Sequence, residues 1–599
     1  MNIFAAPRRF VRNIGTLFLL GFRADPARTA GLIFAELLAS SFLLISTVMI
    51  KYVVQEATAG KLEGTLIAAL ILAAAGGAGT IIYIFYASLA LKVRDAVNLY
   101  LETEFIRLTS QIPTLEYQDR PEHADKIELI RASQSQLASA TFALAQNLRT
   151  VVMLAGSLAI MIHIDYRFAF LPLFAIPRAI AGRKAQLWAK QVQEDTAEPI
   201  RLSRHLYNQA ASAVAGKELR LFGLQNEFLH RVRGISAQVQ AAKDRIAWRT
   251  ALILSLTDAI FMAGCLGGIA LVVIRAAAHR LGLGDVVLVA TMAASITLLV
   301  GAALQSGYML QNMLLTVERY LWLADFSAAA ANPPAHSSQL PARLAQGISI
   351  ENISFAYPDH EQPVLAGISL TLRAGQVIAL VGENGSGKST FVKLLCGFYR
   401  PSAGRIAIDG LDLAEVRMED WRARVSAAFQ DFTNFELPLH ESVSLGDLRE
   451  PADRPRITGA MERAGAGDLV SLKPSGLDTS LGKKWGGVDL SGGQWQRLAL
   501  SRAVIRDQPL LVVFDEPAAA LDPMAEHDMF ERFAAAARSE AAAGCVTILV
   551  SHRFSTVRMA DLILVLDGGR IVESGSHQAL MANGGTYAEL FELQAKAYR

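Results

Sequence analysis

Long apolar runs dominate the part of the chain before residue 330. Five of them could each cover the roughly 20 residues that span the hydrocarbon core of a bilayer. The pattern therefore predicts a polytopic α-helical membrane domain. These runs lie at about 30–50, 65–91, 138–164, 250–274 and 286–310.

A sixth span is expected at about 168–182, where a shorter apolar run contains Pro172 and Pro177. It follows a tight turn at 165–167, and the chain has to return across the bilayer. With six spans, both ends of this half lie on the same side of the membrane.

Basic residues indicate which side that is. The polar segment 183–245 is rich in Arg and Lys, and the polar segment 92–131 carries several basic residues. Cytoplasmic loops carry an excess of such residues. We expect both segments in the cytoplasm and the shorter loops at 51–63 and 275–284 outside. The protein would then be an integral protein of the cell (inner or plasma) membrane.

The N-terminal segment 1–28 contains Arg8, Arg9 and a short apolar core, but no small-residue cleavage site before Arg23. A signal peptide would carry such a site. We predict instead an amphipathic helix lying on the inner membrane surface. Too few residues precede the first span for a fused peptidase domain, and none is expected.

An Ala-, Pro- and Ser-rich linker separates this half from a region where short β-like runs alternate with helical runs. Strands are expected at 348–355, 377–381, 510–514 and 547–550. The last three are almost wholly apolar, which is typical of a sheet covered on both faces. The alternation predicts an α/β domain with ligands at the carboxyl ends of its strands. The predicted organisation has four parts: 1–28, 29–327, 328–346 and 347–599.

Composition agrees with a membrane protein. Of 599 residues, 52% are hydrophobic, and the mean hydropathy is +0.31. The net charge of +2 is too small to indicate a nucleic-acid partner, and none is expected. Cys265, Cys396 and Cys545 have neither metal nor disulfide spacing.

The strand at 377–381 runs into Gly382-Glu-Asn-Gly-Ser-Gly-Lys-Ser-Thr390, and a helical run follows. The pattern G-x-x-x-x-G-K-[ST] places backbone N–H groups at a helix N-terminus around a polyphosphate. Lys388 supplies charge for the outer phosphates, and Ser389 a hydroxyl for Mg²⁺. The residues expected to bind nucleotide here are Gly382, Asn384, Gly385, Ser386, Gly387, Lys388, Ser389 and Thr390.

The strand at 510–514 ends in two carboxylates. Asp515 at the strand tip can hold Mg²⁺ through water, because this ion keeps much of its hydration shell. Glu516 is placed to orient an attacking water beside the γ-phosphate. Two acids after a strand are common, and the upstream phosphate loop is what indicates catalysis.

Leu490-Ser-Gly-Gly-Gln494 opens a helix predicted at 495–504. Glycines let backbone amides approach a phosphate, and Ser491 adds a hydroxyl. This stretch, downstream of the phosphate loop, resembles the signature sequence of ATP-binding cassette (ABC) transporters. The resemblance is strong over 348–577 and weaker over the membrane half.

The resemblance implies further roles. Tyr357 would stack on adenine, Gln430 would sense Mg²⁺ and face the membrane domain, and His552 would contact the γ-phosphate. Asp522 lies in the loop after the catalytic acid. The signature of one subunit would close on the phosphate loop of a second. That signature comprises Ser491, Gly492, Gly493 and Gln494.

Two cytoplasmic stretches, 116–121 and 216–223, resemble the coupling helices of the family and would press on the ATPase domain near Gln430. Plain solvated helices are the alternative. The sequence departs from many exporters just before the signature, where Lys483-Lys-Trp-Gly-Gly487 replaces a stretch of the Gly-Glu-Arg-Gly kind.

Polar groups within the spans are costly and therefore informative. They could line a transport cavity. Alternatively, Arg149 and Asp258 could form an internal pair, or the helices could extend beyond the bilayer. The residues concerned are Arg149, Asp258, Gln305 and Gln311.

We interpret the chain as an exporter-type half-transporter that uses ATP and Mg²⁺. It has one phosphate loop, while the family's composite site needs two, so a homodimer is the simplest assembly. A heterodimer, or an exporter fold working as an importer, is the alternative. Apolar spans favour an amphipathic substrate such as a lipid, peptide or drug-like molecule, and a metal chelate stays open.

Three other classes fit less well. A soluble ABC protein of translation or DNA repair would lack the apolar spans. An importer component would usually carry its ATPase on a separate chain. A non-hydrolysing regulator or receptor would be expected to lose Glu516 or the signature, and both are present.

Overall fold

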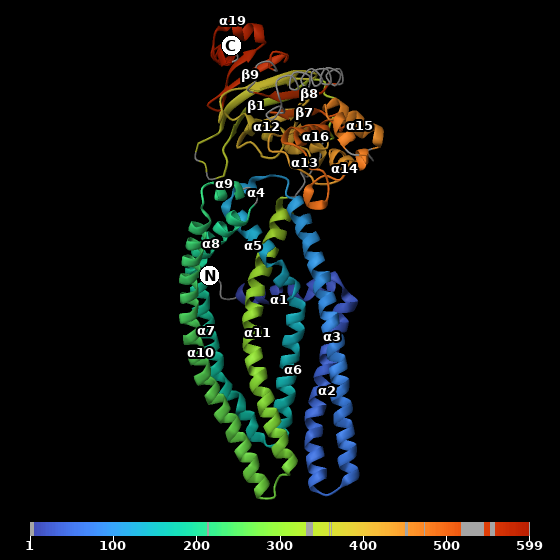
Figure 1. Ribbon diagram of the computed structural model, residues 1–599, viewed down its shortest axis with the longest axis vertical. Coiled ribbons are helices and arrows are strands. Elements are labelled where there is room, and N and C mark those ends of the chain that lie inside the picture. The colour runs from blue at the N-terminus through green and yellow to red at the C-terminus, as the bar shows by residue number, and fades with distance from the viewer. Residues whose placement is uncertain are drawn as a thin grey trace. The chain divides into compact units, whose positions relative to one another are not determined.

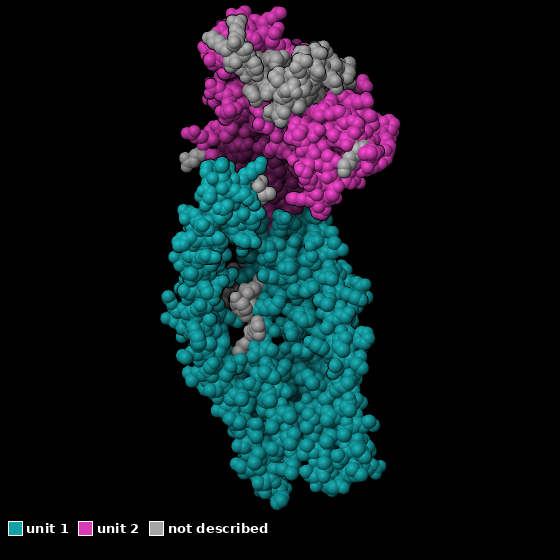
Figure 2. Space-filling view, in the orientation of Figure 1, with its two compact units in different colours: residues 1–107, 128–323 teal, residues 108–127, 324–599 magenta. Residues whose placement is uncertain are grey.

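The protein divides into two compact units in a computed structural model, one made of residues 1–107 and 128–323 and the other of 108–127 and 324–599 (Figure 2). The structure describes 5–212, 215–330, 339–358, 360, 362–449, 453–472, 474–516, 544–551 and 557–597.

The first unit is helical, and its long helices run alongside one another (Figure 1). Helix α7 packs along α10, and α2 packs along α6. The chain continues from α3, α5 and α11 into the second unit. The helices are α1 Ala5–Ala24, α2 Pro26–Thr58, α3 Leu62–Ser110, α5 Pro121–Ala138, α6 Ala140–Ile164, α7 Leu171–Asp195, α8 Ala197–Ala211, α9 Gly216–Leu221, α10 Gln225–Ala277 and α11 Leu283–Ala330.

Five of the described helices are long and apolar enough to cross a membrane: α2, α3, α6, α10 and the first part of α11. Large apolar side chains on them, such as Leu70 and Phe85, are exposed rather than packed in a core. Such a surface is expected to face lipid rather than water. The protein is therefore an integral membrane protein.

The region expected as a sixth span is helical but less apolar. A 3₁₀ turn at Tyr166–Phe170 leads into α7, which contains Pro177 and is not among the five helices above. A sixth crossing stays a prediction. Helix α1 has the helical periodicity of polar and apolar residues that an amphipathic helix requires, and Leu17 and Leu20 are buried.

Ion pairs in this unit join different helices from those expected. The Nε atom of Arg149 lies 3.2 Å from Oε1 of the buried Glu36, and Arg178 pairs with Asp258. The proposed Arg149–Asp258 pair is therefore wrong, because α6 packs on α2 while α10 packs on α7. The side chains of Gln305 and Gln311 lie outside the described part of the chain.

The second unit is built on two sheets. A four-stranded antiparallel sheet has the order β2-β1-β4-β5, and a six-stranded sheet has the order β10-β9-β3-β8-β7-β6. In the larger sheet β9, β3, β8, β7 and β6 are parallel, and β10 is antiparallel to β9. The strands are β1 Gly347–Phe355, β2 Leu365–Arg373, β3 Val377–Val381, β4 Ala403–Ile408, β5 Leu411–Asp412, β6 Val425–Ala428, β7 Leu511–Asp515, β8 Val546–Val550, β9 Leu562–Asp567 and β10 Arg570–Gly575.

The four strands expected from the sequence correspond to β1, β3, β7 and β8, each within one residue at either end. Every residue of β3, β7 and β8 is buried, as the apolar runs predicted. The described α-helices of this unit are α4 Glu116–Asp119, α12 Lys388–Leu395, α13 Met418–Arg422, α14 Leu439–Ser444, α15 Arg454–Arg463, α16 Gly492–Val504, α19 His577–Asn583 and α20 Thr586–Ala597.

Packing holds α12 against the sheet at the end of β3. Phe391 and Leu395 of α12 belong to the same buried cluster as Ile378 and Leu380 of β3. The fully buried Trp421 donates from its indole Nε1 to the carbonyl of Leu395 at 2.8 Å. The start of α12 is thereby positioned beyond the carboxyl edge of the sheet, where ligands bind in such folds.

Candidate nucleotide site

The loop between β3 and α12 depends on glycine. Gly382, Gly385 and Gly387 have φ values of 151°, 84° and 104°, a region that side chains disfavour. A Cβ atom on Gly382 would lie 2.1 Å from the carbonyl oxygen of Leu566. The loop therefore wraps closely against β9 and presents its backbone at the N-terminus of α12, where anions bind.

Lys388 is the first residue of α12 and is buried. Its ammonium donates to the carbonyls of Gly382 at 2.9 Å and Glu383 at 2.8 Å. Burial lowers the pKa of Lys388, and the carboxylates of Glu516 and Asp515 partly offset that effect. A cation in this position can bind the outer phosphates of a nucleotide.

Two hydroxyls of the same loop differ in surroundings. Ser389 is exposed and so is accessible to a hydrated cation. The Oγ atom of Ser386 is buried and has no hydrogen-bond partner within the described ranges. A buried hydroxyl left unpaired is unfavourable, and a phosphate oxygen could satisfy it.

Glu516 has an unusual backbone conformation, with φ of 48°. Its N–H donates to the carbonyl of Val550 at 3.0 Å, so β8 fixes the strained residue. Gln430 donates from Nε2 to Glu516 Oε2 at 2.9 Å, and Gln496 donates from Nε2 to the Glu516 carbonyl at 3.3 Å. The bond from Gln430 orients the carboxylate, and the bonds to Val550 and Gln496 fix the backbone of Glu516 at the edge of the sheet.

Asp515, the last residue of β7, is buried next to Glu516. Burial raises the pKa of Asp515 to about 6, and the negative charges of Glu516 and Asp431 add to this effect. Such a site favours a cation. No group of three or more metal-ligating side chains occurs within the described ranges, so phosphate oxygens and water would complete the coordination of Mg²⁺.

The signature stretch forms the start of α16, which begins at Gly492 rather than at the predicted Trp495. Ser491 is the N-cap of the helix. Its Oγ accepts from the Gln494 N–H at 3.3 Å, while Gln494 Oε1 accepts from the Ser491 N–H at 2.8 Å. This capping box leaves Ser491 and Gly492 exposed, so a second anion-binding helix start faces outward.

An aromatic group lies beside the phosphate loop. The hydroxyl of Tyr357 is 3.1 Å from Oγ1 of Thr390. The ring of Tyr357 contacts Phe355 and Tyr399 edge-on, with centroids 5.0 and 5.3 Å apart. Tyr357 is therefore attached to the first turn of α12, whose N-terminus would bind the phosphates of the same nucleotide.

Sequence reasoning overlooked Gln496 and Tyr399. Gln496 lies one turn into the signature helix, where its buried side chain reaches Glu516. Only its position after the signature could have drawn attention to it. Asp522 and His552, and with them the expected contact to the γ-phosphate, lie outside the described residues.

Both predicted coupling stretches contain short helices, α4 and α9. In α9, Leu219 is buried, while Leu221 and the following Phe222 are exposed.

The stretch Lys483–Gly487, where the sequence differs from many exporters just before the signature, forms a turn. In this turn the ammonium of Lys483 pairs with the carboxylate of Asp489 at 3.0 Å. Trp485 of that turn donates from Nε1 to Oε2 of Glu436 at 2.9 Å.

Comparisons with known proteins agree with this geometry. Residues 365–519 match the ABC transporter family. The chain is 32% identical over 447 residues to the ATP-dependent lipid A-core flippase of Chromobacterium violaceum, covering 73% of each chain. It is 29% identical over 532 residues to the flippase of the same name from Xanthomonas campestris, covering 87% of this chain and 85% of the relative.

A solved structure of a bacterial Atm1-family ABC exporter with ATP bound is also similar. It has a TM-score of 0.79 at 24% identity, over 95% of this chain and 99% of the other. The chain belongs to the ABC transporter family and has the exporter fold, with membrane helices and ATPase domain on one chain. It is an ATPase that couples ATP hydrolysis to transport, and half-transporters of this kind act as dimers.

Proposed function

We propose that two copies of this chain form an ATP-driven exporter for an amphipathic substrate such as a lipid, a peptide or a drug-like molecule.

Within this range, a lipid is the substrate that we favour. The relatives in Chromobacterium violaceum and Xanthomonas campestris are named as flippases of lipid A-core. The long helices of this chain expose apolar side chains to the bilayer, where a lipid substrate would enter. The ATPase domain would lie in the cytoplasm, because the basic segments 92–131 and 183–245 favour that side.

The observation that carries the ATPase mechanism is the orientation of Glu516 by Gln430 and Gln496. In this mechanism Glu516 polarises the attacking water, and Lys388 neutralises charge on the outer phosphates. Ser389 and Asp515, with Gln430, would hold Mg²⁺, which supplies further neutralisation of the phosphate charge. His552 is proposed to contact the γ-phosphate.

Dimerisation is supported by the exposure of the signature. Ser491 caps its own helix and lies at the surface, where it is accessible to the phosphate loop of a second copy. The chain carries a single phosphate loop at 382–390.

A coupling role for α9 is supported by its apolar surface. Leu221 and the following Phe222 are exposed and could contact an ATPase domain.

The test is ATPase and flipping activity of the purified protein in liposomes. Candidate lipids, peptides and drug-like amphiphiles are each added, and a fluorescent lipid reports movement between leaflets. We expect a lipid to stimulate hydrolysis and ATP to drive its movement, and Glu516→Gln to slow both by orders of magnitude. ATP hydrolysis that moves none of these classes in either direction would contradict the proposed substrate range.

A further inference from the structure

Residues 113–119, here called the coupling segment, lie against the loop that follows α12. The N–H of Leu115 donates to the carbonyl of Phe398 at 2.9 Å. The guanidinium of Arg422 bridges the two elements, donating to the carbonyls of Pro113 and, at 2.6 Å, Gly397. The coupling segment is therefore held to residues directly after the phosphate-loop helix.

A side-chain hydrogen bond completes this attachment. The hydroxyl of Tyr399 donates to Oδ2 of Asp119 at 2.5 Å. Tyr399 is buried. Burial raises the pKa of its hydroxyl, and the bond to Asp119 adds to that effect, so the phenol stays a donor. A short bond from a hydroxyl to a carboxylate is among the stronger hydrogen bonds in proteins.

The same tyrosine contacts the proposed adenine platform. Its ring meets Tyr357 edge-on, with the ring planes at 84°, and also contacts Phe355 at 5.3 Å between centroids. The neighbouring Phe398 contacts Phe429, which precedes Gln430, at 5.7 Å. The loop after α12 thus touches residues at both ends of the nucleotide site.

We propose that Tyr399 is a positioning residue that links the coupling segment to the nucleotide base. Through its bond to Asp119, it holds Tyr357 in the orientation that accepts the base. Because coupling between two sites is reciprocal, a bound base also strengthens the attachment of the coupling segment. This inference rests on the proposed ATPase function and on the role that the family resemblance gives Tyr357, which is to stack on adenine.

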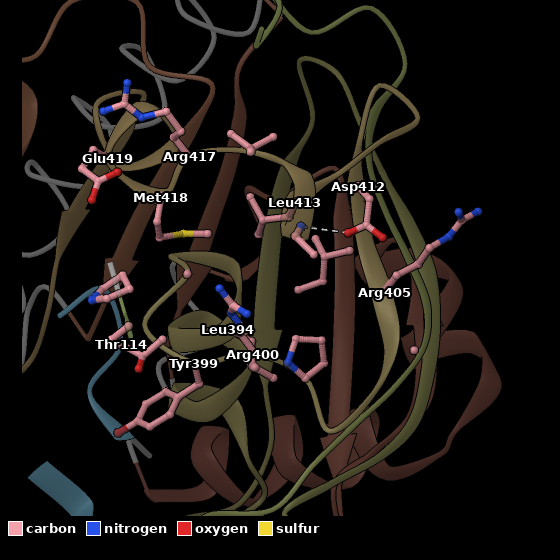
Figure 3. A pocket seen from close by; sticks show the side chains of 18 residues that line it. Thr114, Leu394, Tyr399, Arg400, Arg405, Asp412, Leu413, Arg417, Met418 and Glu419 are labelled. Carbon is pink, nitrogen blue, oxygen red and sulfur yellow. Dashed lines mark hydrogen bonds between the residues drawn. The ribbon is translucent and has the colours of Figure 1, made fainter. Parts of the chain in front are cut away.

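A cavity beside Tyr399 explains why the hydrogen bond matters. It has a volume of about 210 Å³, and Thr114, Tyr399, Arg400 and Met418 are among the residues that line it. Figure 3 shows Tyr399 and Thr114 at one wall. One side of the buried Tyr399 ring packs on aromatic neighbours, and another side borders this cavity. Without the bond to Asp119, the ring has room to reorient without unfolding the domain.

The experiment compares Tyr399→Phe and Asp119→Ala in the full-length protein in liposomes. Each removes the hydrogen bond, and Tyr399→Phe keeps the ring. The KM for ATP should rise about three- to tenfold, as for the loss of one hydrogen bond, while kcat stays within about twofold of wild type. Ribose triphosphate, which lacks the base, should inhibit wild type and variants equally.

Three controls separate positioning from general damage. Tyr117→Phe removes another hydroxyl of the coupling segment, one that accepts from Gln118, and should behave as wild type. Asp119→Asn keeps an acceptor and should lose less affinity than Asp119→Ala. The double variant of Tyr399→Phe and Asp119→Ala should be no weaker than either single variant, because both break one interaction.

A second readout follows the coupling segment itself. Nucleotide should slow hydrogen exchange of a peptide covering 113–119, and less so in Tyr399→Phe. An unchanged KM, or an equal loss of affinity for ribose triphosphate, would overturn the proposal.

Direct titration of ATP provides affinities even without turnover. An inactive wild type would therefore refute the proposed function while the affinity comparison still decides the role of Tyr399.

Discussion

The side-chain amide of Gln430 donates a hydrogen bond to the carboxylate of Glu516, with 2.9 Å between Nε2 and Oε2. Gln430 follows β6 and Glu516 follows β7, and these strands are parallel neighbours. Their carboxyl ends therefore meet at one edge of the sheet. Any ligand that draws Gln430 away changes the hydrogen bonding of the proposed general base.

Glu516→Gln should leave ATP binding intact and slow turnover by about 10²–10⁴, the range for loss of a general base. The variant should accumulate with ATP bound. Single-turnover hydrolysis and direct ATP titration measure the two effects. Glu351→Gln, which changes an exposed pair with Arg405 on the other sheet, is the matched control. Turnover within severalfold of wild type would remove Glu516 from this role.

Lys388→Ala should weaken nucleotide binding itself, because it deletes the charge that the phosphate loop holds at 2.9 Å from the Gly382 carbonyl. Titration with ATP measures the affinity. Lys393→Ala removes a lysine from the last turn of the same helix and should bind ATP as wild type does. Unchanged affinity in Lys388→Ala would count against the placement of this lysine.

Mixing two inactive chains tests the shared site. Ser491→Arg and Lys388→Ala should each abolish activity as homodimers. A mixed dimer has one interface with both changes and one with neither, so ATPase activity should return in proportion to the mixed fraction, measured with two affinity tags. Cysteines placed beside Ser491 and Gly385 should also crosslink between chains when ATP is present. Failure of both measurements would refute a site shared between chains.

Asp447→Asn should destabilise the ATPase domain by about 2 kcal/mol, less than the loss of a fully buried ion pair because Arg449 is partly exposed. Asp447 pairs with Arg449 at 2.9 Å and Arg456 at 3.0 Å. Burial opposes ionisation, yet hydrogen bonds from these arginines bring the pKa of Asp447 down to about 2. The stabilisation is therefore present above the ordinary Asp pKa.

The stability difference between wild type and Asp447→Asn should be lost as the pH falls from about 4 to 2, because Asp447 then becomes protonated in the folded state as well. Thermal unfolding in detergent at neutral and acidic pH measures it. Asp478→Asn changes an exposed pair with Arg454 and should have little effect. Equal stability of wild type and Asp447→Asn at pH 7 would contradict the prediction.

Glu36→Gln should destabilise the membrane half more than the double change Glu36→Gln with Arg149→Met. The single variant leaves Arg149 beside a buried neutral side chain, whereas the double variant removes both charges. Glu227→Gln, in an exposed pair with Arg231, is the control. Thermal stability in detergent should rank the double variant above the single one, and the opposite order would argue against a mutual pair.

Several elements of the site could be predicted because their signals are local. The buried strands at 377–381 and 547–550 are continuous apolar runs, and β3 and β8 follow them closely. The phosphate loop requires glycines at particular positions because its backbone has positive φ values there. These glycines can be recognised directly in the sequence. The capping box of Ser491 and Gln494 is equally local, although the helix starts earlier than expected.

The sequence by itself determined the family, the apolar helices and the residues of the phosphate loop and signature. Only the tertiary structure decided that Arg149 pairs with Glu36, that Gln496 reaches Glu516 and that Tyr399 binds Asp119. Such contacts join residues far apart in the chain. They depend on how helices rotate and strands align when they pack, and a local pattern of apolar and polar residues does not encode that arrangement.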